Sequence, residues 1–273
     1  MNSPIGVFDS GYGGLTVLNS IKKTLPEYDY IYLGDNARAP YGTRSFDVVY
    51  QYTLEAVKYL FEQNCRLIIL ACNTASAKAL RTIQQNDLPK LYPDRRVLGV
   101  LRPTTEEVGL FTKSGYVGIL GTTGTINSNS YQIEINKFFP ELKVVQQSCP
   151  MWVPLVENNA FKEKGGEYFV QKYLDELFTK EARIDTLILA CTHYPLLKDV
   201  ILKHIPQGVK LVEQGDLVAN KLKDYLSRHK DLNAEISKQS NLSILTTENS
   251  QKFDGHLKLF YGTDLKSKTI HIN

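Results

Sequence analysis

The sequence of 273 residues predicts an α/β fold with two similar domains, each built on a parallel β-sheet. Short apolar strand candidates alternate with helical patterns, which implies parallel strands joined by right-handed crossovers. The strand candidates are continuously apolar, as suits a sheet that helices cover on both faces. The same pattern restarts near Gly115, and the length suits two domains of ~150 residues each. We therefore expect two pseudo-symmetric copies of one unit.

In the first half, four strand candidates are separated by helical patterns. The pattern after residue 45 is the clearest, because its apolar residues recur every three or four positions and form one face of a helix. That face comprises Phe46, Val49, Thr53, Ala56, Val57, Leu60 and Phe61. In chain order we expect strands at 5–10, 30–35, 66–72 and 96–100, and helices at 15–23, 46–61 and 75–85.

The second half repeats this alternation and then ends in a more irregular tail. We expect strands at 115–122, 143–148 and 185–191, a strand and turn at 209–216, and helices at 127–138, 167–178 and 195–204. From Asp231 the tail reads as a polar linker, followed by apolar segments at 242–247 and 257–262.

Two cysteines follow strand candidates in matching contexts. The segments LIILACNTAS and LILACTHYPL each join an apolar run to Ala-Cys and then to a threonine, and they place Cys72 and Cys191 119 residues apart (191 − 72 = 119). Ligands of open α/β sheets bind beyond the carboxyl ends of the strands, so two facing halves would present both thiols to one ligand from opposite sides. Cys65 and Cys149 have no such context, and we interpret them as structural.

A pair of opposed thiols suits proton exchange at a stereocentre. A thiolate can take a proton from one face of a carbon, and a thiol can return a proton to the other face, which gives the mirror image. A free cysteine is often only a small buried hydrophobe. Two cysteines in matching polar contexts nevertheless favour two-base racemisation over that interpretation.

Polar residues near the first strand and in the turn at 39–42 suggest a cradle for an amino acid. The motif FDSGYGG places Asp9 and Ser10 at a strand end, before a glycine-rich turn whose backbone N–H groups could meet an anion. Asp9 could instead bind an ammonium group or help a nearby thiol to lose its proton. The APYG turn offers further backbone donors, from Tyr41 and Gly42 among them.

Further polar residues follow the two cysteines. The side chains of Asn73, Thr74 and Thr192 could bind carboxylates without adding net charge. His193 could accept the proton of Cys191. It could also be half of a metal pair, or simply a helix-capping or surface histidine.

Composition and charge argue against several other classes of protein. The net charge of +3 is spread along the chain without a basic stripe, so we expect no nucleic-acid partner. No apolar run approaches the ~20 residues of a membrane helix, and no secretory signal is visible, so we expect a cytoplasmic protein without membrane contact. There is no CxxC spacing and no evident pyridoxal lysine motif, so we expect neither a metal nor an organic cofactor.

Six motifs together resemble the glutamate racemase family, and they span Ile5 to about Gly215. The resemblance implies a cofactor-independent isomerase that interconverts L- and D-glutamate and supplies D-glutamate for peptidoglycan. It implies two similar α/β domains with the active site between them, the first discontinuous at 1–97 plus 212–273 and the second at 98–211. The motifs are FDSGYGG, YLGDNARAPYG, ACNTAS, GILGTTGTINSNSY, CPMWVPLVE and LACTHYPLL.

The resemblance also assigns roles to residues. Cys72 and Cys191 correspond to the catalytic pair, assisted by Asp9, His193 and Glu157. The implied substrate contacts are Asp9, Ser10, Tyr41, Gly42, Asn73, Thr74, Thr122, Thr125, Thr192 and His193.

One position departs from the family pattern. Many members carry an acidic residue in the motif written here as GVLRP, where this chain has Arg102. The departure leaves open a different dimer contact or effector response. We expect a homodimer with glutamate as its small-molecule substrate.

Three other functions compete with this hypothesis. A racemase for aspartate or another small amino acid would use the same thiol pair in a pocket of different length. A cysteine hydrolase would use Cys191 and His193, form an acyl-enzyme and make Cys72 dispensable. A non-enzymatic binding protein would hold an amino acid without changing its chirality.

Overall fold

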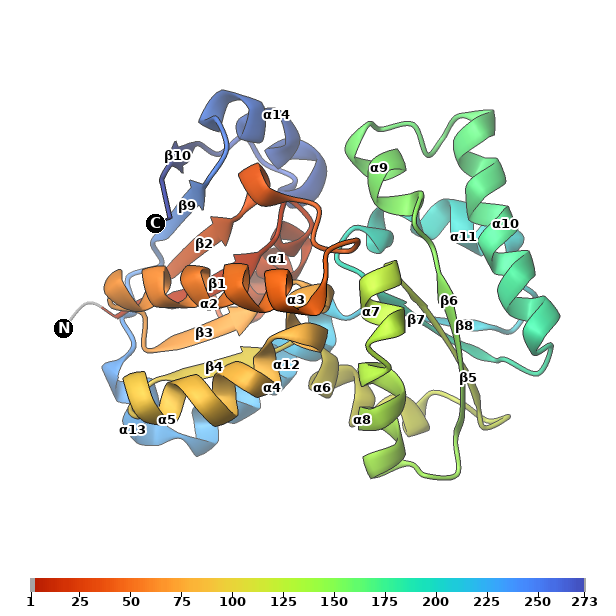
Figure 1. Cartoon of the computed structure of the whole chain (residues 1–273), viewed down its shortest axis with the longest axis horizontal. Helices are drawn as coiled ribbons and strands as arrows, with labels where there is room; N and C mark the ends of the chain where they lie inside the picture. The colour runs from red at the N-terminus through yellow and green to blue at the C-terminus, as the bar shows by residue number, and fades with distance from the viewer. Residues whose placement is uncertain (1–2, 273) are drawn as a thin grey trace.

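The computed structural model describes residues 3–272, which form two α/β lobes lying side by side (Figure 1). The first lobe holds a six-stranded sheet in the order β10-β9-β2-β1-β3-β4, and the second a four-stranded sheet in the order β6-β5-β7-β8. Every pair of neighbouring strands is parallel. The strands are β1 (Ile5–Asp9), β2 (Tyr30–Gly34), β3 (Leu67–Leu70), β4 (Arg96–Gly99), β5 (Tyr116–Gly121), β6 (Lys143–Ser148), β7 (Thr186–Ala190), β8 (Lys210–Val212), β9 (Leu242–Thr246) and β10 (Ser267–Thr269).

The two sheets repeat one topology, which confirms the predicted fold class. The order β2-β1-β3-β4 of the first lobe corresponds strand by strand to β6-β5-β7-β8 of the second. β3 and β7 are therefore equivalent strands, as the matching cysteine contexts predict. Strands β9 and β10 extend only the first sheet, beyond β2.

The helices of the first half cover the first sheet. α2 begins after Ser45, whose Oγ accepts a hydrogen bond from the backbone N–H of Val48 and so satisfies one open donor of the helix start. The predicted apolar face of α2 is buried except for Phe46, which is 49% exposed at the first turn. The elements are α1 (Gly14–Thr24), η1 (Asn36–Arg38), α2 (Phe46–Glu62), α3 (Asn73–Lys78), α4 (Leu80–Thr82), the π-helical η2 (Ile83–Asp87) and α5 (Leu88–Leu91).

Two expected helices are interrupted. The segment 75–85 is divided among α3, α4 and η2, and its first helix starts earlier than expected because Cys72 acts as its N-cap. The segment 127–138 is split at Asn129, whose φ of 53° is left-handed, a conformation that asparagine tolerates better than most residues. The second lobe contains α6 (Leu101–Thr105), η3 (Val108–Leu110), α7 (Thr123–Asn127), α8 (Ser130–Phe138), α9 (Trp152–Glu157), α10 (Lys164–Lys180), η4 (Tyr194–Leu197) and α11 (Lys198–His204).

The C-terminal part differs most from the expectation. α12 (Gly215–Arg228) was not predicted, although Val218, Ala219, Leu222 and Leu226 form its buried face. The predicted linker begins within α13 (Lys230–Glu235). The apolar segment 257–262 mostly belongs to α14 (Ser250–Tyr261), which begins at the Asn249 cap.

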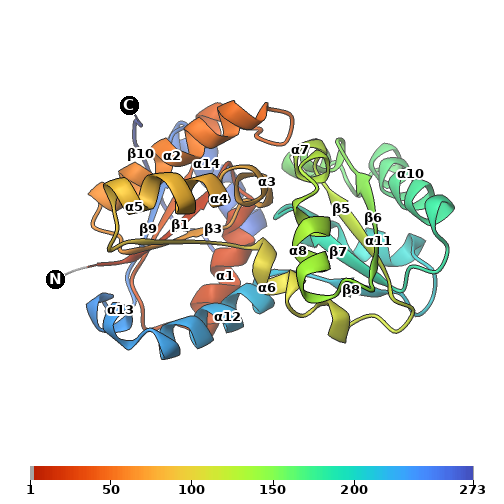
Figure 2. The same cartoon turned by 60° about the horizontal axis from the view of Figure 1, so that its bottom comes forward.

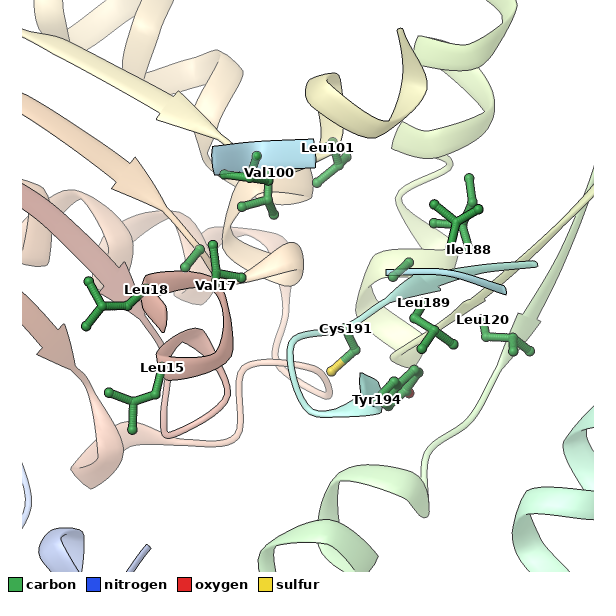
Figure 3. Close-up of a cluster of buried hydrophobic side chains, with 14 of the residues drawn as sticks. Leu15, Val17, Leu18, Val100, Leu101, Leu120, Ile188, Leu189, Cys191 and Tyr194 are labelled. Carbon is green, nitrogen blue, oxygen red and sulfur yellow. The ribbon is translucent and has the colours of Figure 1, made fainter. Parts of the chain in front are cut away.

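A hydrophobic cluster runs through both lobes and positions them. It joins Leu15, Val17 and Leu18 of α1 to residues of the second sheet, with Val100 and Leu101 between them (Figure 3). The chain crosses between the lobes after β4 and again after β8, and α6 and α12 lie at this junction (Figure 2). Among residues 3–272, no helix is both long enough and apolar enough to cross a membrane.

Candidate active site

The two predicted thiols occupy equivalent places at the carboxyl ends of β3 and β7. Cys72 caps α3, and its Sγ accepts a hydrogen bond from the backbone N–H of Ala75 at 3.4 Å. Cys191 follows β7 directly, and its carbonyl accepts from the N–H of Tyr194 at 3.1 Å. Both cysteines are largely buried, at 5% and 7% exposed. The sulfur of Cys191 points toward the first lobe (Figure 3).

Cys72 lies in an environment that favours the neutral thiol. Burial, and then the negative charge of Asp9, raise the pKa of Cys72 to about 12, while Ser10 and Ala75 oppose this rise through hydrogen bonds. The Oγ of Ser10 is 3.4 Å from Sγ of Cys72. A negative charge on Cys191 also raises the pKa of Cys72 slightly, so the two thiols lie within electrostatic reach of each other.

Asp9 ends β1 and is 1% exposed. Its Oδ2 accepts the backbone N–H of Gly11 at 2.9 Å, and its Oδ1 accepts the hydroxyl of Thr192, on the other lobe, at 3.5 Å. Burial raises the pKa of Asp9 despite the opposing charge of His193 and the N–H groups of Gly11 and Gly14. The N–H groups of Gly11 and Gly14 are therefore directed at the protein's own carboxylate, whereas the sequence suggested a bound anion.

Gly13 allows the two lobes to meet closely. A Cβ at this position would lie 2.2 Å from Oγ1 of Thr192 and 2.5 Å from Nδ1 of His193. The φ of Gly13 is −59°, so the requirement is for space and not for an unusual backbone conformation. Thr16 completes this contact by donating its hydroxyl to the carbonyl of Thr192 at 3.1 Å.

On the other side, Cys191 is followed by a polar relay. Sγ of Cys191 is 3.9 Å from Nδ1 of His193, and Nε2 of His193 is 2.9 Å from Oε1 of Glu157. Burial alone would lower the pKa of His193, but Cys191 and Glu157 outweigh it and raise this pKa to about 10. His193 is therefore protonated at neutral pH and can exchange a proton with the sulfur beside it.

Helix α14 of the first lobe covers this relay. The Nε2 of His256 donates to the carbonyl of Glu157 at 3.3 Å, and the ring of Phe260 meets His193 edge-on at 5.2 Å between centroids. Figure 1 shows α14 and α9 facing each other across the junction of the lobes. The relay is thus enclosed by both lobes.

Three threonines form a hydroxyl cluster across the lobes. Oγ1 of Thr74, in α3, is 3.0 Å from Oγ1 of Thr122 and 3.2 Å from Oγ1 of Thr125, both at α7. The backbone N–H of Gly124 donates to the carbonyl of Gly42 at 2.7 Å. The 39–42 turn is thereby joined to the threonine loop of the second lobe.

Asn73 and Tyr41 differ in the hydrogen-bonding groups that they leave available for a ligand. The hydroxyl of Tyr41 donates to Oδ2 of Asp35, so only the backbone of this turn remains for a ligand. Oδ1 of Asn73 accepts the hydroxyl of Tyr131 at 2.6 Å, whereas Nδ2 of Asn73 is buried and has no hydrogen-bond partner among residues 3–272. Asn73 therefore presents a free donor.

The structure brings the predicted site residues to one place, where the carboxyl ends of the two sheets meet. Two surface hollows contain none of them: one is lined by residues including Tyr168 and Glu176, and the other by residues including Leu88 and Arg95. Sequence reasoning missed five residues of the site region, for different reasons. Tyr131 lies inside a quoted motif, and Gly13 and Thr16 follow the FDSGYGG strand end. The other two, Gln214 and His256, carry no local signal because only the packing of the lobes brings them close.

Comparison with known proteins agrees with this geometry. The family model described as Asp/Glu/Hydantoin racemase matches residues 5–222. The glutamate racemase of Geobacter metallireducens is 44% identical over 238 residues, which cover 87% of this chain and 84% of that protein.

Two solved structures are similar over nearly their whole length. A glutamate racemase isoform from Bacillus anthracis superposes with a TM-score of 0.89 at 33% identity, covering 99% of this chain and 98% of that one. The glutamate racemase of Francisella tularensis, solved in complex with D-glutamate, gives a TM-score of 0.87 at 33% identity, covering 100% and 98%. The chain therefore belongs to the Asp/Glu/Hydantoin racemase family.

Proposed function

We propose that this protein interconverts L-glutamate and D-glutamate by two-base proton transfer at Cα, with Cys72 and Cys191 as the bases. The observation that carries this proposal is the equivalence of the two thiols, each at the carboxyl end of its lobe's corresponding strand. The glutamate specificity is supported by the relatives, which are named glutamate racemases at 36–44% identity over much of the chain. A racemase for aspartate is the less favoured alternative.

In the proposed reaction, one cysteine is a thiolate and the other a thiol. The thiolate takes the proton from Cα and becomes a thiol, leaving the electron pair on the substrate. The second thiol gives its proton to the opposite face of Cα and becomes the thiolate. Asp9 and Ser10 assist Cys72, and the His193–Glu157 relay assists Cys191. The reverse reaction exchanges the roles of the two sulfurs.

The substrate's own carboxylate serves as the electron sink, so the site must hold it firmly. We assign this task to Asn73, Thr74 and Thr192, with the Tyr41–Gly42 turn and the cluster of Thr122 and Thr125 completing the cradle. Preorganised donors of this kind contribute ~3 kcal/mol each to a developing oxyanion in a dry site. We assign to Asp9 the task of keeping the substrate ammonium protonated.

The buried thiols imply that the lobes separate to admit glutamate. We place the two domains at 1–97 plus 212–273 and at 98–211. The chain connections that would flex lie at the ends of β4 and β8, at Gly99 and Val212. Closing over the substrate would then expel water and strengthen the electrostatic interactions inside the site.

The physiological setting follows from the same chemistry. We infer that the enzyme supplies D-glutamate for peptidoglycan, the general role of its family. The reaction needs reduced thiols, and all four cysteines are free, which supports a cytoplasmic location. Exposed apolar side chains on the second lobe, Leu110 and Ile133 among them, support a homodimer, which sedimentation would test.

The direct test is circular dichroism of D-glutamate incubated with the pure protein and no added cofactor. The signal should decay to zero as the enantiomers equilibrate, and L-glutamate should give the mirror-image decay. D-aspartate, assayed in parallel, should change much more slowly. A constant signal from D-glutamate would contradict racemisation, and faster decay of D-aspartate would reverse the choice of substrate.

A further inference from the structure

We propose that Gln214 and Tyr131 are positioning residues that aim the amide NH₂ of Asn73 at the carboxylate of the bound amino acid. The inference rests on the proposed function and adds two residues to it. Gln214 is the N-cap residue of α12, where the chain returns to the first lobe, and Tyr131 lies in α8 of the second lobe. All three residues are buried, at 4% exposed or less.

The orientation of the Gln214 amide is fixed by a backbone carbonyl. Its nitrogen lies 3.1 Å from the carbonyl oxygen of Val100 and 3.0 Å from Oγ1 of Thr104. A carbonyl oxygen can only accept a hydrogen bond, so the amide nitrogen and not the amide oxygen must face Val100.

This orientation determines which way the Tyr131 hydroxyl points. The same nitrogen of Gln214 lies 2.7 Å from the hydroxyl oxygen of Tyr131 and donates to it. A phenol has one hydrogen, which then remains free for another acceptor. That acceptor is Oδ1 of Asn73, at 2.6 Å.

The Tyr131 hydroxyl in turn fixes the amide of Asn73. Because Oδ1 faces Tyr131, Nδ2 must lie on the opposite side of the planar amide. There it is buried without a partner among residues 3–272, a state that buried polar groups rarely adopt. A carboxylate would supply the missing acceptor through a charge-assisted hydrogen bond.

The chain of hydrogen bonds also connects the NH₂ group of Asn73 to the junction between the two lobes. Val100 follows β4 and Gln214 follows β8, so the first bond links the two connections between the lobes. Asn73 starts α3, directly after the thiol of Cys72. The NH₂ group of Asn73 is thus aligned when the two connections are packed together.

The test is a pair of thermodynamic cycles. Tyr131→Phe and Gln214→Met each break the chain while preserving side-chain bulk, and each is made both in the native chain and with Asn73→Ala. In the native background we expect each variant to lower kcat/KM by about 10-fold, mainly through a higher KM. With Asn73→Ala, neither variant should lower kcat/KM further, because both act through Asn73.

Tyr30→Phe is the matched control. Within residues 3–272 the buried hydroxyl of Tyr30 bonds only to the carbonyl of Leu25, and Tyr30 begins β2, at the end of the strand opposite the site. We expect its kcat/KM to equal that of the native protein, and thermal melts of all the variants show whether each is folded. Equal losses with and without Asn73→Ala, or no loss from either variant, would overturn the inference. A native protein that does not racemise glutamate would instead overturn the proposed function on which the inference rests.

Discussion

The two thiols hold equivalent positions in the fold but have different neighbours. Cys72 is the cap of a helix, with the hydroxyl of Ser10 beside it and the carboxylate of Asp9 close by. Cys191 begins a turn, and its sulfur faces the imidazole of His193, whose other nitrogen is hydrogen-bonded to Glu157. The first setting favours a neutral thiol, and the second supplies a protonated histidine. A repeated topology thus places the two bases, while neighbouring residues that differ between the two lobes adjust each one.

Removing either thiol should have the largest effect. Cys72→Ala and Cys191→Ala should each lower kcat/KM by at least about 10³-fold, because each direction of the reaction needs both a base and an acid. The loss must be equal in the two directions, since the enantiomers have the same free energy. Circular dichroism with L- and D-glutamate measures both rates, and Cys65→Ala, at a buried cysteine in the same lobe, is the control. Near-normal turnover by Cys191→Ala would refute the paired-thiol mechanism.

Disturbing the close contact between the two lobes at Gly13 should have the next largest effect on activity. Gly13→Ala puts a methyl group where Oγ1 of Thr192 and Nδ1 of His193 now lie, so the lobes must shift apart. Misplacement of about 1 Å can cost about 100-fold in rate, and we expect a loss of that order in kcat/KM.

Gly255→Ala in α14 is the matched control for Gly13→Ala. No other part of residues 3–272 outside the helix's own backbone lies within 4 Å of the added Cβ, so this variant should keep full activity and gain about 0.5–1 kcal/mol of stability. Equal activity of the two alanine variants would show that the close approach at Gly13 does not matter.

The raised pKa of His193, beside Cys191, predicts that the stability of the protein depends on pH. The pKa of His193 is raised from 6.5 to about 10 in the folded protein, so its protonated form stabilises the fold. This contribution is complete below pH 6.5 and is lost as the pH rises toward 10, by at most about 1.4 kcal/mol per pH unit. The partial exposure of Glu157 lowers this ceiling further.

Urea unfolding of the native protein and of His193→Gln, at pH 6.5 and pH 8.5, measures this contribution. The native protein should lose part of its stability advantage over His193→Gln between the two values, because the loss continues up to the folded-state pKa of about 10. Other titrating groups, Cys72 among them, are present in both proteins and largely cancel in the difference. A difference between the proteins that does not change with pH would contradict the assigned pKa.

Arg102 should give the smallest effect. Its side chain is 69% exposed, pairs with Glu106 at 2.7 Å and lies over the ring of Phe138. An exposed ion pair contributes at most about 1 kcal/mol, so Arg102→Ala should leave kcat/KM within about 2-fold and change stability little. Sedimentation of the same variant shows whether this position affects assembly. A large loss of activity would mean that Arg102 acts on the site through a route that the fold does not suggest.

The sequence predicted what local pattern and repetition encode. Apolar runs located the main strands, and the matching Ala-Cys contexts located β3 and β7 as equivalent strands. Gln214 could not be linked to Asn73, because their connection runs through three chain segments that meet only after folding. α12 is predictable in principle from the sequence, since its buried apolar residues recur at helical spacing. The glycine-rich turn lies where the sequence predicts it, but the sequence suggests that it binds an anion. The structure shows instead that Gly13 lets the two lobes pack closely against Thr192, a contact that forms only in the folded protein.

The central claim is that two sulfurs act on opposite faces of one carbon, and racemisation in D₂O tests it most directly. Chiral chromatography followed by mass spectrometry, applied to L-glutamate early in the reaction, should show D-glutamate with deuterium at Cα, while the remaining L-glutamate keeps its protium. In D₂O the second thiol carries a solvent-derived deuteron, which accounts for this difference. Product that retains the original protium at Cα, or deuterium entering the starting enantiomer as fast as the product forms, would contradict the two-base account.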